Sequence, residues 1–323
     1  MSDHSSGAGR PGGVGLAEDT GQALASGTGA AFGTFGELLQ GVLPNDGAFL
    51  VTLPLDVWAR ARFWPDTCDG EVHTVPPGKY KARQVARRVL DAVGHRGGGL
   101  LELSSELPEG KGLASSSADL VATVRAVGAA FGARFTPAQT EEFLRGIEPT
   151  DGVMYDEIVA FHHRAVRLRG RLGRLPRLVI VAHDEGGQVD TVRHNRNSSP
   201  FGAGERAEYA RLLAQLHRAV ADGDLATVGR ISTRSAELNV LVRPRAGLAR
   251  LRDACREADG VGLVLAHSGT MLGVAFAADD PELDGKTDYV RTVCAAWPGT
   301  VRVFGTLGEG STWSASADGG GTT

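Results

Sequence analysis

The stretch ELPEGKGLASSSADL, residues 106–120, places two glycines, a lysine and three consecutive serines where the chain changes its periodicity. The preceding residues, 100–107, read as a β-strand, and from Leu120 onward apolar residues fall on one face of a helix. The sequence therefore predicts a strand, a glycine-rich turn and a helix that begins at Ser115 or Ser116.

The chemistry of this turn suits a polyphosphate. The first amide N–H groups of a helix lack intrahelical partners and carry partial positive charge, which favours phosphate. Gly110 and Gly112 let the backbone approach such a ligand without a Cβ clash. The serine hydroxyls can donate to phosphate or ligate Mg²⁺, and Lys111 adds a positive charge. A well-capped helix after a flexible turn is the alternative interpretation of the same residues.

Two common phosphate-binding motifs are excluded by the spacing. In a P-loop the Gly-Lys pair is followed by Ser or Thr, whereas here Gly112 follows Lys111. A dinucleotide fingerprint requires G-x-G-x-x-G with an acidic residue at the proper distance in a βαβ unit, and the sequence lacks this combination.

Composition places the chain among ordinary globular proteins. With 323 residues, 42% hydrophobic and 22% charged, it can form one large domain or two closely packed ones. The net charge of -4 indicates neither nucleic acid nor a membrane surface as a partner, and no apolar run approaches the roughly 20 residues that span a bilayer. The three cysteines form no zinc or disulfide pattern, which favours a cytoplasmic setting.

The pattern along the chain predicts an α+β fold, because strands and helices are mixed without strict alternation. Residues 1–28 read as a disordered extension, 29–175 and 176–310 as two halves, and 311–323 as a flexible tail. We expect strands at 49–55, 58–63, 100–107, 177–184 and 300–306, a β-hairpin within 260–279, and helices at 79–94, 115–131, 137–146, 209–220, 224–242, 248–258 and 281–296.

Three segments resemble the GHMP kinases. PEGKGLASSSA, residues 108–118, is similar to the family's P-x-x-x-G-L-G-S-S-A-A signature, with Ala114 in place of its last glycine and Ser117 in place of its first closing alanine. Residues 32–42 resemble the N-terminal motif beside the phosphoryl acceptor, and 264–276 resemble the glycine-rich hairpin that supports the phosphate loop. The resemblance implies the GHMP kinase fold, with an N-terminal half like ribosomal protein S5 and an α+β C-terminal half.

Finer similarities point to one branch. GELLQG, EPTDG (148–152) and AHSG (266–269) resemble the L-threonine kinases, which make O-phosphothreonine for the cobalamin side chain. The resemblance implies ATP and Mg²⁺ as cofactors and a small hydroxylated amino acid as acceptor. Homoserine kinase, another GHMP kinase of secondary metabolism and a non-catalytic nucleotide-sensing protein are the alternatives.

Site residues follow from the same resemblance. The phosphate loop wraps ATP, and Ser116 reaches Mg²⁺, with Glu148 as a second metal ligand or an exposed surface carboxylate. Lys111 is either a phosphate ligand or a solvated loop residue. The residues expected to bind the nucleotide are Pro108, Gly110, Lys111, Gly112, Leu113, Ala114, Ser115, Ser116, Ser117 and Gly269.

Asp151 is the expected catalytic carboxylate, which orients or deprotonates the acceptor hydroxyl. Its alternative role is to cap a helix that begins near Val153. Glu37 and Gln40 are expected to bind the acceptor's ammonium and polar groups, with a salt bridge as the alternative for Glu37. His267 is given a minor role in the substrate site.

A run of arginines within 164–177 has no place in this scheme. It could steer an anionic ligand, but a solvated loop is the usual explanation of such a run.

Overall fold

A computed structural model describes residues 25–45, 47–67, 70–186, 201–240, 244–266 and 269–308. The predicted tail, most of the predicted N-terminal extension, Cys68 and His267 lie outside the described residues. Strand β1 begins at Gly27, so the last two residues of the predicted 1–28 extension belong to the fold.

The described residues form one large mixed α+β structure around a single sheet. Its strands follow the order β10-β7-β9-β8-β1-β2-β4-β3, and β5 pairs with β2 and β6. The strands are β1 Gly27–Leu43, β2 Gly47–Pro65, β3 Val72–Val75, β4 Gly99–Ser105, β5 Ile158–His162, β6 Arg167–Gly173, β7 Leu178–Asp184, β8 Gly262–Leu265, β9 Met271–Ala277 and β10 Thr300–Gly305.

The long antiparallel hairpin of β1 and β2 connects the two halves of the chain. Its register runs from Gly27 opposite Phe63 to Leu43 opposite Gly47, with irregularities around Thr34 and Glu37. On its other edge β1 pairs with β8 at Glu37 and Leu265. The sheet is therefore continuous between the segments predicted as separate halves, and the division into two halves stays a prediction.

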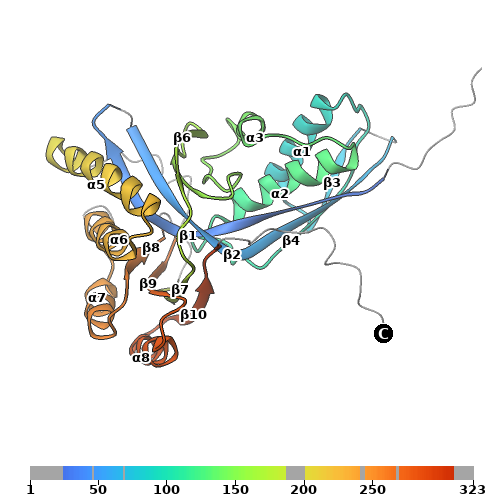
Figure 1. The fold of residues 1–323 in the computed structure, drawn as a ribbon. Helices are drawn as coiled ribbons and strands as arrows, with labels where there is room; N and C mark the ends of the chain where they lie inside the picture. The colour runs from blue at the N-terminus through green and yellow to red at the C-terminus, as the bar shows by residue number, and fades with distance from the viewer. Residues whose placement is uncertain are drawn as a thin grey trace, which may run out of the picture.

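Helices cover the sheet in two groups (Figure 1). Helices α1, α2 and α3 lie together along one stretch of the β1–β2 hairpin, α5 and α6 pack on β1 toward its other end, and α7 and α8 lie beside β7 to β10. The helices are α1 Tyr80–Ala92, α2 Ser115–Ala130, α3 Pro137–Leu144, α5 Ala203–Ala221, α6 Leu225–Val240, α7 Leu248–Glu257 and α8 Leu283–Ala295. Across the described ranges, none of the helices combines the length and the apolarity that crossing a bilayer requires. The cytoplasmic setting stays a prediction.

Most predicted elements are confirmed, and local signals explain their ends. Helix α1 ends before Gly94, which adopts a positive φ of 76°. Helix α3 begins at Pro137 after Thr136, which forms a capping box with Gln139. The apolar faces of these helices pack into a core that includes Val85, Val89 and Leu144.

Two interpretations of the sequence are wrong. The arginine run is not only a solvated loop, because its middle forms β6, which pairs with β5. Arg171 and Arg174 form ion pairs with Glu157 and Asp156, so these charges are partly neutralised. No helix begins near Val153, where the described backbone forms turns and bends instead.

Candidate active site

The glycine-serine turn leads into α2 as predicted, and its backbone is tightly wound. Gly110 and Gly112 have φ of 73° and 79°, and Ala114, directly before the helix, has φ of 59°. A positive φ costs a residue with a Cβ roughly 1–2 kcal/mol, which explains why glycine suits the position of Ala114.

Two neighbouring segments fix this turn in place. The backbone N–H of Thr34 in β1 donates to the Leu113 carbonyl at 3.1 Å. From the other side, Gly269 in the connection between β8 and β9 packs directly on the turn. A Cβ on Gly269 would lie 1.7 Å from the Lys111 carbonyl oxygen, and one on Gly112 would lie 2.6 Å from the Gly269 nitrogen. Both glycines are therefore required for this contact.

The side chain of Lys111 is directed to the same hairpin connection. Its Nζ lies 2.8 Å from Asp184 Oδ2 at the end of β7, and Asp184 also accepts a hydrogen bond from Thr270. Burial opposes ionisation of Asp184, but the hydrogen bonds from Lys111 and Thr270 prevail and lower its pKa. Lys111 is thus not a solvated loop residue, and its role as a phosphate ligand stays a prediction.

A second set of contacts secures the hairpin connection. Arg245 has a side chain only 2% exposed, and it donates to the Gly269 carbonyl and forms an ion pair of 3.1 Å with Glu185. Glu185 in turn accepts from the backbone N–H of Gly247 at 3.1 Å. We name the four charged side chains Lys111, Asp184, Glu185 and Arg245 the hairpin-side network.

On its open side the turn borders a cavity of about 300 Å³ between the starts of α1 and α2. Because the first amides of both helices are there, two partial positive charges meet at its wall. Polar and charged side chains complete the lining. The described lining residues are Gly78, Lys79, Tyr80, Lys81, Ala82, Glu109, Gly110, Ser115, Ser116, Asp119 and Leu120.

Ser116 and Glu148, the two predicted metal ligands, are brought together at this cavity. Ser116 Oγ donates to Glu148 Oε1 at 2.5 Å, and Lys81 Nζ forms an ion pair with Glu148 Oε2. The Glu148 side chain is 8% exposed, so it is not the exposed surface carboxylate that the sequence left as an alternative.

A second lysine and two more carboxylates lie on the same wall. Lys79 Nζ is 2.8 Å from Asp119 Oδ2 and 2.5 Å from Glu109 Oε1. Burial raises the pKa of Asp119, and the ammonium of Lys79 partly offsets this rise. We name Lys79, Lys81, Glu109, Asp119 and Glu148 the cavity-side network.

Asp151 lies next to these groups. Its backbone N–H donates to Ser117 Oγ at 3.2 Å, which ties it to the first turn of α2. Burial, followed by the negative charge of Glu148, raises the pKa of Asp151 to about 7. A carboxyl group with this pKa exchanges a proton near neutral pH, as a general base must.

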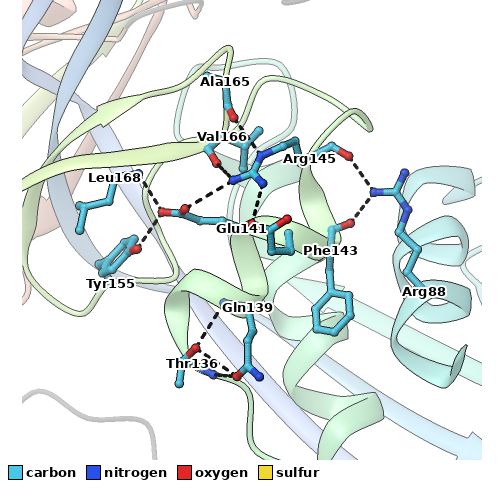
Figure 2. Close-up of polar contacts among 11 residues, drawn as sticks. Arg88, Thr136, Gln139, Glu141, Phe143, Arg145, Tyr155, Ala165, Val166 and Leu168 are labelled. Atoms are coloured by element: carbon cyan, nitrogen blue, oxygen red, sulfur yellow. Dashed lines mark hydrogen bonds and ion pairs between the residues drawn. The ribbon is translucent and has the colours of Figure 1, made fainter. Parts of the chain in front are cut away.

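The loop that carries Glu148 and Asp151 rests on a hydrogen-bonded scaffold between α3 and β6 (Figure 2). Glu141, which is buried, accepts from Tyr155 Oη at 2.7 Å and from the Leu168 amide at 2.8 Å. Arg145 at the end of α3 donates to the Val166 carbonyl at 3.2 Å. These contacts fix both ends of the loop, so its carboxylates are positioned by buried structure.

Glu37 and Gln40, the predicted acceptor ligands, are both 3% exposed in β1. The backbone N–H of Gln40 donates to Ser235 Oγ of α6 at 3.1 Å. Glu37 lies opposite Thr52 in the β1–β2 pair, and the Thr52 hydroxyl accepts from the backbone N–H of Val159. The side chain of Val159 in turn packs on Gly152, which follows Asp151. A polar strip of β1 thus lies near the Asp151 loop, and the substrate role of these residues stays a prediction.

The donor set at the cavity fits Mg²⁺. This ion prefers oxygen ligands and commonly takes one or two from the protein, with water and phosphate supplying the rest. A serine hydroxyl and a carboxylate already in contact, with Asp119 on the same wall, provide such oxygens. The described part of the chain contains no cluster of three or more His, Cys, Asp or Glu side chains suited to a metal.

Comparison with known proteins agrees with this architecture. Residues 80–160 match the family model for the GHMP kinases N terminal domain, and this segment includes α1, the turn, Glu148 and Asp151. The crystal structure of a homoserine kinase from Cytophaga hutchinsonii superposes with a TM-score of 0.69 and 14% identity, covering 91% of this chain and 97% of that one. The described chain has the fold of the GHMP kinases, and residues 80–160 match their N-terminal domain. The predicted GHMP kinase fold is thereby confirmed.

Two curated proteins are similar to this chain in sequence, each at 24% identity. An L-threonine kinase from Citrobacter freundii is 24% identical over 186 residues, 57% of this chain and 64% of that protein. An L-threonine kinase from Salmonella typhimurium (strain LT2) is 24% identical over 250 residues, 74% of this chain and 79% of that protein. The first match thus spans less than two thirds of the relative's length.

Sequence reasoning missed several residues of the site. Lys79, Lys81 and Asp119 lie in helices that were predicted. The ion pairs of Lys79 with Asp119 and of Lys81 with Glu148 join residues 40 and 67 positions apart in the sequence, so no local pattern indicates them. Asp184 was read only as the end of a strand. The available signal was the pair of lysines on either side of Tyr80, where α1 begins. Two lysines are unusual there, because the first turn of a helix favours acidic residues.

Proposed function

We propose that this protein is an ATP-dependent kinase that transfers the γ-phosphate to the hydroxyl of a small amino acid, L-threonine. The observation that carries the proposal is the contact of Ser116 with Glu148 at the start of α2, beside Asp151 with a pKa of about 7. Phosphoryl transfer needs a phosphate cradle, charge neutralisation and an oriented hydroxyl, and these residues supply one group for each.

The backbone from Gly110 to Ser117 would cradle the phosphates. The amides at the start of α2 donate hydrogen bonds and carry partial positive charge, and the glycine backbone admits close approach. Ser116 and Glu148 would hold Mg²⁺, which supplies Lewis-acid neutralisation of phosphate charge when bound. The carbonyl and side chain of Lys111 instead support the loop from the hairpin connection.

Asp151 would orient the acceptor hydroxyl and accept its proton. The bond from its amide to Ser117 keeps it at a constant position relative to the cradle. Its raised pKa makes it a better proton acceptor than an ordinary aspartate once it is ionised. Because Glu148 contributes to that rise, neutralisation of Glu148 by a cation would lower the pKa of Asp151 and favour its basic form.

Glu37 supports an amino acid as acceptor. A carboxylate that is 3% exposed is suited to an ammonium group, and mevalonate has none. The similarity to L-threonine kinases favours threonine among hydroxylated amino acids. The product would then be O-phosphothreonine for the cobalamin side chain, as the sequence resemblance implies.

A coupled ADP-release assay with product analysis across threonine, serine, homoserine and mevalonate tests this proposal. We expect the highest kcat/KM with threonine, and loss of the ammonium preference in Glu37→Gln. Glu102→Gln, the same substitution at an exposed glutamate on β4, serves as the matched control. Turnover of mevalonate with none of threonine would overturn the amino-acid assignment, and a preference for homoserine would move the protein to that branch.

A further inference from the structure

Lys81 is the second residue of α1, yet it reaches the loop that follows α3. Its side chain is 25% exposed and lines the cavity, and its Nζ forms an ion pair with Glu148 Oε2. The other oxygen of Glu148 accepts from Ser116. A positive charge therefore already occupies the carboxylate that the proposed function assigns to a divalent cation.

The cavity-side network leaves little positive charge for a phosphate while these pairs persist. Among its described members, the two lysines face three carboxylates, so the side chains together carry one net negative charge. A nucleoside triphosphate brings several more negative charges to the same wall. Binding is favourable only if a cation compensates the carboxylates and frees an ammonium for phosphate.

We propose that Lys81 is an exchangeable counter-charge: it neutralises Glu148 in the empty enzyme and contacts a phosphate oxygen when a divalent cation and nucleotide are bound. This inference rests on the proposed function, because it requires a metal-nucleotide at this cavity. It assigns Lys81 two partners in two states, whereas a purely structural lysine keeps one partner in both.

The two states predict opposite effects of one substitution. With no nucleotide, Lys81 and a divalent cation compete for Glu148, so removal of the ammonium strengthens metal binding. With nucleotide, Lys81 binds phosphate, so its removal weakens nucleotide binding. A lysine that only stabilises the fold would weaken both or change neither.

The experiment measures Mn²⁺ binding to the full chain by electron paramagnetic resonance, and ATP binding by calorimetry, in wild type and Lys81→Met. We expect Lys81→Met to bind Mn²⁺ about fivefold more tightly, and ATP with Mg²⁺ about tenfold more weakly. Lys79→Met is the matched control, since it removes the same charge from the same cavity but its partners are Asp119 and Glu109. Its Mn²⁺ affinity should rise less than that of Lys81→Met.

The proposal is overturned if Lys81→Met leaves Mn²⁺ affinity unchanged or lower, or if Lys79→Met raises it equally. Lys81→Gln provides a second variant, and thermal unfolding shows that each variant is folded. This result can be told apart from a failure of the proposed function. If Lys81→Met strengthens Mn²⁺ binding and weakens ATP binding in a protein that phosphorylates no amino acid, only the proposed amino-acid kinase activity is refuted. An active wild type without the opposite signs would refute the role of Lys81 alone.

Discussion

The phosphate loop has a charged network on each side, and the two differ in their partners and surroundings. The hairpin-side network pairs Lys111 with Asp184, 19% and 9% exposed, and Arg245 with Glu185, 2% and 22% exposed. The cavity-side network pairs Lys81 with Glu148, 25% and 8% exposed, and Lys79 with Asp119, 24% and 7% exposed, and both of its lysines line the cavity. Similar pairs of lysine and carboxylate thus serve two different purposes.

The difference indicates that the hairpin-side pairs stabilise the fold, whereas the cavity-side lysines can contact a ligand. Buried pairs are costly to break because the remaining partner stays desolvated, so the hairpin-side network should behave as a scaffold. The cavity-side carboxylates are equally buried, but their lysines line the cavity, where water or a cation can replace the ammonium at a smaller cost. Substitutions on the hairpin side should therefore affect stability first, and those on the cavity side should affect binding and catalysis first.

The largest expected effect is on the cavity side, at Asp151. Asp151→Asn should lower kcat by about 10³-fold, because the loss of a general base typically costs 10²–10⁴-fold. ATP affinity measured by calorimetry should stay within about twofold, since the bond to Ser117 uses the backbone amide. Asp156→Asn, at an exposed carboxylate nearby, is the control. Unimpaired turnover in Asp151→Asn would contradict the catalytic assignment.

On the hairpin side, Gly269→Ala should mainly destabilise the protein, by about 3 kcal/mol. The added Cβ meets the Lys111 carbonyl oxygen at 1.7 Å, so the loop or the hairpin must move. Gly285→Ala is the matched control, because no atom lies near its Cβ within α8, and it should stabilise by about 0.5–1 kcal/mol. Urea unfolding measures both changes. Equal stabilities of the two variants would refute the tight contact between loop and hairpin.

The raised pKa of Asp151 also predicts that replacing this carboxyl group increases the folding stability while removing the proposed base. The raised pKa means that folding is destabilised once this carboxyl is ionised. The cost in folding free energy is complete above pH 7, shrinks as the pH falls, and is absent below the ordinary pKa of 3.8. Asp151→Asn should therefore gain about 2 kcal/mol at pH 8, less than the full shift implies because the group is partly exposed, and nothing at pH 3.5. Thermal unfolding at both pH values measures this gain, and a gain independent of pH would contradict it.

A smaller effect should separate Lys111 from Lys81. Lys111→Met should destabilise by about 1–2 kcal/mol because it leaves Asp184 buried with fewer donors. A double-mutant cycle with Asp184→Asn should recover most of this loss as coupling energy. Lys81→Met should destabilise less, because Ser116 still donates to Glu148 and the cavity admits water or a cation in place of the ammonium. If the two lysine variants lost stability equally, the distinction between the networks would fail.

The smallest effect is expected at the turn itself. Ala114→Gly should stabilise by about 0.5–1 kcal/mol, because glycine adopts the φ of 59° without strain while the unfolded chain gains freedom that offsets part of the benefit. Ala118→Gly, inside α2, should instead destabilise. Urea unfolding compares the two variants. A loss of stability in Ala114→Gly would show that the turn is not strained.

Local signals explain which parts of the fold were predictable. The start of α2 at Ser115, the cap at Thr136 and the glycine after α1 depend on a few adjacent residues, and all were predicted from them. The strand β6 was missed because arginines fill its exposed positions, so its alternation with Leu168 and Leu172 was hidden in a basic run. Charge on an edge strand is common and conceals a strand from a reading based on apolar period.

The site was predictable only where a motif carried it. Ser116, Glu148 and Asp151 were expected from the family resemblance, and the structure brings their segments together. The ion pairs of Lys81 with Glu148 and of Lys111 with Asp184 form because elements far apart in the sequence pack together. No local sequence pattern predicts such contacts. The expected role of His267 lies outside the described residues.

A crystal structure with Mg²⁺ and a non-hydrolysable ATP analogue tests the central claim most directly, that the amides at the start of α2 bind the triphosphate. We predict phosphate oxygens within hydrogen-bond distance of the Ser115–Ser117 amides, with the Lys111–Asp184 ion pair intact. A nucleotide bound elsewhere, with this turn and cavity empty, would contradict the account.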